Sequence, residues 1–118
     1  MKTQGLSLIH RYVLLHNEGV HCRDFSAMLE LFADDAIMRF EHSALPELIG
    51  TYSIQRAFRT NPPDESLVLL SATVEGDLTA AEYAWESSEN IIAGTIEMTE
   101  VGGFIKKLVV RFAKFDHI

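Results

Sequence analysis

The chain has 118 residues, of which 47% are hydrophobic and 23% charged, with a formal net charge of −7 at pH 7. This length fits one domain, residues 1–118, with enough apolar surface for a core, which excludes a disordered chain. Ten Lys and Arg against 17 Asp and Glu leave no basic face, so a nucleic-acid partner is excluded. No apolar stretch is long enough to span a membrane. The single cysteine, Cys22, cannot form an internal disulfide, and we expect a cytoplasmic protein.

The first third of the chain predicts two helices and a short strand. Apolar residues recur at helical spacing from about residue 4 to residue 17, and Gly19 can end this helix because it adopts the left-handed conformation easily. Asp24 can cap a second helix through its carboxylate, and that helix should end near Ala33. Residues 37–40 then alternate as a strand, with Met38 and Phe40 on one side.

The rest of the chain predicts a third helix followed by four strands. The helix begins near residue 51 or 53 and ends before Pro62, because the residue before a proline is pushed out of the helical region. Residues 42–50 look irregular, and strands are predicted at 67–74, 79–88, 90–101 and 104–115. Helices first and antiparallel strands afterwards indicate an α+β fold, with the helices packed on one face of a sheet.

Four sequence features fit one known family. They are Arg11-Tyr12-Val13, Leu31-Phe32-Ala33-Asp34-Asp35-Ala36, Gly50 with Ile54 and Phe58, and the closing hairpin. With the element order, they resemble the nuclear-transport-factor-2-like (NTF2-like) superfamily, in particular its ketosteroid-isomerase-like and SnoaL-like branches. The resemblance implies a cone-shaped, bent antiparallel sheet wrapped around three N-terminal helices, a cystatin-like α+β barrel. It also implies a deep apolar pocket, no cofactor, and a homodimer formed through the outer face of the sheet.

The resemblance also suggests catalytic residues. Tyr12 stands where the family places its oxyanion-hole tyrosine, and Glu97 stands where it places a protonated acid. The position of the family's catalytic aspartate is occupied by Phe40, which cannot accept a proton. His42 should share a side with Phe40 and is the candidate replacement base, because imidazole titrates near neutrality. Glu41 is the rival base if a bulge shifts the strand.

Each of these residues also has a plainer structural interpretation. The ring of Tyr12 can simply pack in the core, and His42 can be a solvated loop residue. Glu97 shares its side of the strand with Thr95 and Thr99, which suits a solvent-facing surface. The histidines lack the spacing of a two-ligand helical face, so we expect no metal, with a Cys22, His21 and His16 group as the alternative.

The predicted pocket has an apolar wall. Its candidate residues are Met38, Phe40, Phe58, Tyr83 and Trp85, which together suit a flat, apolar organic ligand. The favoured function is an isomerase or cyclase that transfers a proton next to a carbonyl group. A non-catalytic ligand-binding or dimerisation module is the alternative, because the usual base is absent. A third possibility is epoxide opening, with Arg39 between Glu41 and Glu97.

Overall fold

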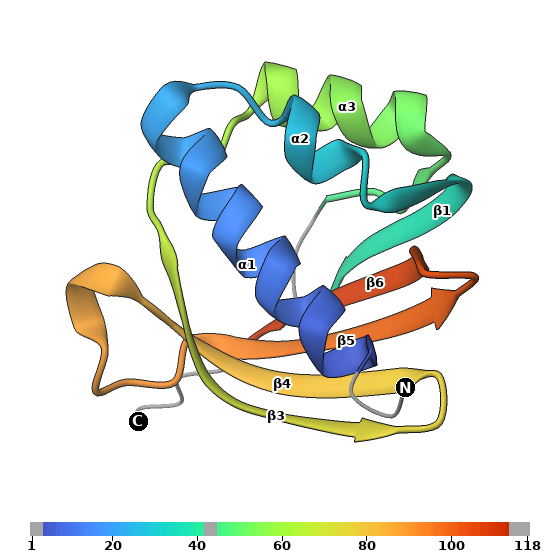
Figure 1. Cartoon of the computed structure of the whole chain (residues 1–118). Helices are drawn as coiled ribbons and strands as arrows, with labels where there is room; N and C mark the ends of the chain where they lie inside the picture. Colours follow the sequence, from blue (N-terminus) through green and yellow to red (C-terminus); the bar gives the residue numbers. More distant parts are fainter. Residues whose placement is uncertain (1–3, 42–44, 114–118) are drawn as a thin grey trace.

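The computed structural model describes residues 4–41 and 45–113, and Figure 1 shows how their helices and strands are arranged. In chain order the elements are α1 (Gln4–Cys22), α2 (Ser26–Leu29), β1 (Phe32–Glu41), β2 (Leu48–Ile49), α3 (Thr51–Thr60), β3 (Leu67–Glu75), β4 (Leu78–Trp85), the 3₁₀ turn η1 (Glu86–Ser88), β5 (Gly94–Val101) and β6 (Phe104–Phe112). The α+β fold is confirmed, as are the third helix and the order of the strands.

Six strands form one sheet in the order β2-β1-β6-β5-β4-β3. The sheet is mixed, because β1 pairs in parallel with β6 while the other neighbours are antiparallel. The expectation of a purely antiparallel sheet is therefore wrong at this one pair. The short strand β2, in a segment predicted to be irregular, pairs with Ile37 and Met38. In Figure 1 the sheet curves beneath α1, while α2 and α3 lie toward the β1 edge.

The first helix is longer than its sequence predicts. Gly19 does not end it. A side chain at this position would lie 2.3 Å from the ring of Phe25, so the glycine allows the helix to pack closely against that ring. The left-handed residue that ends α1 is Arg23, with φ of 60°. The backbone N–H of Asp24 donates to the carbonyl oxygen of Gly19 over 3.2 Å, which completes a Schellman-type helix end.

The second helix is much shorter than predicted. Asp24 does accept from the first-turn amide of Ser26 at 3.0 Å, but α2 ends at Leu29 and not near Ala33. The cause is a long-range contact: the N–H of Ile105 donates to the carbonyl oxygen of Leu31 over 2.8 Å. Pairing with β6 therefore draws the chain into β1 from Phe32 onward, and a bulge between Phe32 and Ile37 takes up the irregularity.

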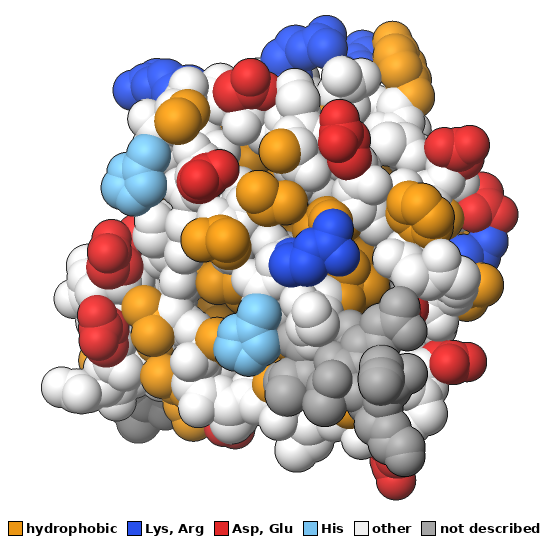
Figure 2. All heavy atoms as spheres, in the orientation of Figure 1, with side chains coloured by type: hydrophobic (Ala, Val, Ile, Leu, Met, Phe, Trp, Pro, Cys, Tyr) orange, Lys and Arg blue, Asp and Glu red, His pale blue; other side chains and the backbone are white. Residues whose placement is uncertain are grey.

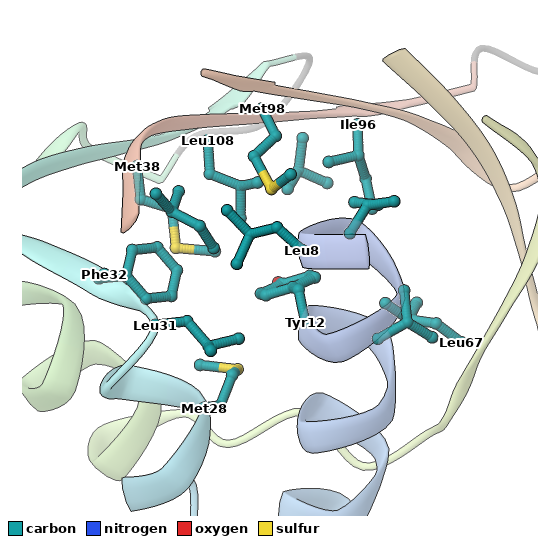
Figure 3. Packing of buried hydrophobic residues seen from close by; sticks show 14 of the residues in the cluster. Leu8, Tyr12, Met28, Leu31, Phe32, Met38, Leu67, Ile96, Met98 and Leu108 are labelled. Atoms are coloured by element: carbon teal, nitrogen blue, oxygen red, sulfur yellow. The ribbon is translucent and has the colours of Figure 1, made fainter. Parts of the chain in front are cut away.

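The core lies between the helices and the concave face of the sheet. Figure 3 shows side chains from α1, α2 and several strands converging there, with Tyr12 of α1 among them. Ile96 and Met98 of β5 are both almost fully buried on this face, so strand alternation sends the side chain of Glu97 to the opposite face. At the start of β5, a Cβ on Gly94 would lie 1.9 Å from the carbonyl oxygen of Arg111, so only glycine allows this close approach to β6.

Two observations concern the outside of the molecule. Figure 2 shows acidic and basic side chains scattered among apolar ones on the face that carries α1. Among residues 4–41 and 45–113, no helix has the length and apolar character needed to cross a membrane.

Candidate functional site: a pocket between the helices and the sheet

A cavity of about 660 Å³ lies between α1, α3 and the curved sheet. A volume of this size suits a small organic ligand. The five residues predicted to form a pocket wall, Met38, Phe40, Phe58, Tyr83 and Trp85, all line it, and so does Tyr12. The remaining lining residues are His16, Leu45, Pro46, Leu48, Ser53, Arg56, Ala57, Thr60, Asn61, Pro63, Leu67, Ile96, Val110 and Phe112.

Two aromatic pairs are among the residues that line the cavity. On β4 the rings of Tyr83 and Trp85 meet edge to face, with centroids 5.6 Å apart. On the neighbouring strands β1 and β6, Phe40 and Phe112 stack with centroids 6.3 Å apart and ring planes 11° apart. Tyr83 and Trp85 meet because alternate residues of a strand share a face. Phe40 and Phe112 meet because β1 pairs with β6. Phe40 is therefore part of the apolar wall.

Two buried tyrosines are among the residues that line the cavity. Tyr12 on α1 is 2% exposed and Tyr83 on β4 is 1% exposed. Burial raises the pKa of Tyr83 to about 12, and burial together with the neighbouring Tyr83 raises the pKa of Tyr12. Both phenols are thus neutral hydrogen-bond donors at physiological pH.

The Tyr83 hydroxyl is buried and has no hydrogen-bond partner among the residues that the structure describes. It lies over Gly94, where a Cβ would come within 2.9 Å of it. A buried hydroxyl without a partner costs stability. The residue Tyr83 lines the cavity, and its hydroxyl has an unused hydrogen that could be donated to a polar atom.

His16 is a second polar group at the cavity, and the sequence arguments for a base did not single it out. It lies one helical turn after Tyr12 on α1, with ring centroids 6.1 Å apart, and is 4% exposed. Its Nδ1 is 3.0 Å from Oδ1 of Asn17. Burial lowers the pKa of His16, and the hydrogen bond to Asn17 opposes this shift in part. The imidazole is therefore neutral at pH 7. Its position one turn after the tyrosine was the available signal.

Two of the predicted catalytic residues lie elsewhere. Glu97 binds Arg111 at 3.1 Å, and Arg111 donates to Glu41 over 2.6 Å. Arg39 also pairs with Glu41, at 3.1 Å. This cluster lies on the outer face of the sheet, and neither glutamate lines the cavity. The expected meeting of Glu97 or Glu41 with Tyr12 is therefore corrected, because strand alternation directs these carboxylates away from the helices.

Three further predictions concern His42, a metal site and Arg39. His42 lies outside the described residues. Within residues 4–41 and 45–113, no group of three His, Cys, Asp or Glu side chains could hold a metal ion. Arg111 lies between Glu41 and Glu97, the arrangement first considered for Arg39, but on the outer face of the sheet.

Comparison with solved structures decides the fold. One similar structure is the "epoxide hydrolase/cyclase-like enzyme SalBIII", described with a role in pyran ring formation in polyether salinomycin. It superposes with a TM-score of 0.78 at 16% identity, over 98% of this chain and 95% of that one. A "putative ketosteroid isomerase" from Kribbella flavida gives 0.74 at 15% identity, over 98% and 82%. An NTF2-like protein from Anabaena variabilis gives 0.74 at 12% identity, over 94% and 90%. The chain has the NTF2-like fold.

The sequence resemblance is thus confirmed at the level of the fold. A designed protein with a curved β-sheet also shares it, with a TM-score of 0.69 at 12% identity, over 96% of this chain and 88% of that one. The NTF2-like fold therefore does not identify an activity by itself. No family profile matches the sequence, and no curated protein matches it.

Proposed function

We propose that this protein binds a small, apolar organic molecule carrying a carbonyl group, and that it acts as an isomerase or cyclase by proton transfer next to that carbonyl. The main support is Tyr83, which lines the cavity and whose buried hydroxyl has no hydrogen-bond partner among the described residues. The largely apolar lining suits a hydrocarbon skeleton, and a carbonyl oxygen is an acceptor that a neutral phenol can bind.

Two features of the cavity would favour charge development on the bound oxygen. The tyrosines are buried, and hydrogen bonds from fixed donors strengthen in a dry site as negative charge grows on the acceptor. The raised pKa values of both phenols keep their protons in place. An enolate formed from a ketone is the kind of intermediate that such donors stabilise.

A binding module without catalysis is the second candidate. Phe40, stacked on Phe112, fills with hydrocarbon the place where the resembling family has its catalytic aspartate. On this interpretation the same ligand would bind and leave unchanged. Native mass spectrometry of gently purified protein, before and after incubation, separates the two cases.

The binding part of the proposal has a built-in reporter. Trp85 is the only tryptophan of the chain and lines the cavity. Titration with 2-decalone, an apolar bicyclic ketone, should change its fluorescence in a saturable way. Tyr83→Phe should bind about 5-fold more weakly through loss of one hydrogen bond, whereas Tyr52→Phe, at a position 72% exposed on α3, should bind as the wild type. Absence of a saturable change would contradict the proposal.

A homodimer is also proposed, on the sequence resemblance alone. The outer face of the sheet offers the cluster of Arg39, Glu41, Glu97 and Arg111 as a polar contact surface. Arg111→Glu would place three carboxylates together and should weaken a dimer formed there. Sedimentation equilibrium on both proteins tests this, and a wild type that is monomeric at all concentrations would contradict it.

A further inference from the structure

We propose that His16 is the catalytic base of this cavity, acting through Nε2 on a carbon next to a ligand carbonyl. The inference rests on the proposed function and assigns the base that it leaves open. Three observations support it, and the first is position. His16 lines the same cavity as Tyr12 and Tyr83, so an imidazole and two tyrosines border one space.

The second observation fixes which nitrogen carries the proton. The backbone N–H of Leu67 donates to Oδ1 of Asn17 over 2.9 Å, and Nδ2 of Asn17 donates to the carbonyl oxygen of Leu67, also over 2.9 Å. A backbone N–H can only donate, so the amide atom that it reaches must be the oxygen. That same oxygen lies 3.0 Å from Nδ1 of His16. Nδ1 must therefore carry the hydrogen.

The third observation follows from the second. A neutral imidazole with its proton on Nδ1 has a lone pair on Nε2, and among the described residues Nε2 has no hydrogen-bond partner in the structure. The tautomer that Asn17 imposes is the one in which the free nitrogen can accept a proton.

The reaction can be written with these groups alone. Nε2 takes a proton from the carbon next to the carbonyl, the C–H bond breaks and an N–H bond forms. The electron pair moves into a carbon–carbon double bond, and the carbonyl oxygen becomes an enolate oxygen facing the tyrosine hydroxyls. The imidazolium, held by Oδ1 of Asn17, then returns a proton to the same carbon or, in a conjugated ketone, to a carbon further along. The substrate class is thus an enolisable apolar ketone.

The test measures hydrogen exchange separately from binding. In D₂O the wild type should catalyse uptake of deuterium next to the carbonyl of 2-decalone, followed by mass spectrometry. His16→Gln should lower that rate about 100-fold or more, the range for loss of a general base, and should still change Trp85 fluorescence on titration. His10→Gln, at an exposed position of the same helix, should exchange as the wild type.

Each outcome decides something. Binding with undiminished exchange in His16→Gln would overturn the base assignment and leave the proposed function standing. A wild type that binds without exchange would overturn both the base assignment and the catalytic part of the proposed function, and would favour the binding module. Absence of binding would remove both. Should His16→Gln fail to fold, ¹⁵N NMR of the wild-type histidine ring decides instead. A proton on Nδ1 supports the proposal, and a proton on Nε2 overturns it.

Discussion

Asn17 of α1 and Leu67 of β3 are joined by two hydrogen bonds of 2.9 Å each, one in either direction between the side-chain amide and the backbone. β3 is an edge strand, so the free side of its backbone would otherwise need solvent. The amide of Asn17 thus joins α1 to the start of the edge strand β3. It also holds His16.

The first prediction concerns this fastening. Asn17→Leu should lower the free energy of unfolding by about 2 kcal/mol, because it leaves the N–H and C=O of Leu67 without their partners at a site largely closed to water. Urea denaturation measures the change. Asn90→Leu, at an exposed position between β4 and β5, is the control and should stay within about 0.5 kcal/mol of the wild type. Equal losses in the two variants would contradict the anchoring role.

The second prediction is that Tyr83→Phe stabilises the protein without ligand. The hydroxyl is buried without a partner in the described part of the chain, so its removal should raise the free energy of unfolding by about 1 kcal/mol. The same substitution should weaken ketone binding, which gives opposite signs for stability and affinity. Thermal unfolding with and without 2-decalone measures both. A loss of stability in the free protein would show that the hydroxyl has a partner after all.

The third prediction concerns pH. The pKa of His16 is lowered in the folded protein relative to 6.5, so below about pH 6.5 the unfolded chain binds more protons at this site. The free energy of unfolding should therefore fall as the pH drops through this range and stop falling below the folded pKa. The other ionisable groups that line the cavity are Tyr12 on α1, Tyr83 on β4 and Arg56 on α3.

The matched variants isolate that contribution. His16→Gln should lose this part of the pH dependence, while His10→Gln, whose histidine is exposed, should retain it. Urea denaturation between pH 5 and pH 8 gives the comparison, taken as the difference from the wild type at each pH. Identical pH profiles for the wild type and His16→Gln would mean that burial does not shift this histidine.

The fourth prediction tests the close approach of β5 and β6. Gly94→Ala should lower the free energy of unfolding by about 3 kcal/mol, because the added methyl would lie 1.9 Å from the carbonyl oxygen of Arg111. Gly76→Asn is the control: its position has φ of +63° and nothing within 4 Å of a Cβ, and asparagine tolerates this conformation. Similar losses at both positions would contradict a steric origin.

The sequence was informative where local periodicity decides the structure. Alternation along β4 places Tyr83 and Trp85 on the cavity side, and alternation along β1 does the same for Met38 and Phe40, as predicted. The short α2 and early β1 could not be predicted, because they depend on the contact of Leu31 with Ile105, 74 residues away.

The candidate catalytic residues show the same division. Thr95 and Thr99 indicated that Glu97 lies on the outer face of the strand, whereas the family resemblance indicated a role in the pocket. The structure places Glu97 on the outer face, beside Arg111. The position of the proton on His16 depends on Asn17, whose amide is oriented by a strand 50 residues further along. No periodic pattern reports such a contact.

The central claim is that the cavity takes an apolar ketone with its oxygen held by a buried tyrosine. A crystal structure of the protein with 2-decalone tests it most directly. The account predicts the ring system against Trp85 and Phe40, and the ketone oxygen within hydrogen-bonding distance of the Tyr83 or Tyr12 hydroxyl. A cavity filled by the protein's own side chains, or a ketone oxygen directed away from both tyrosines, would contradict it.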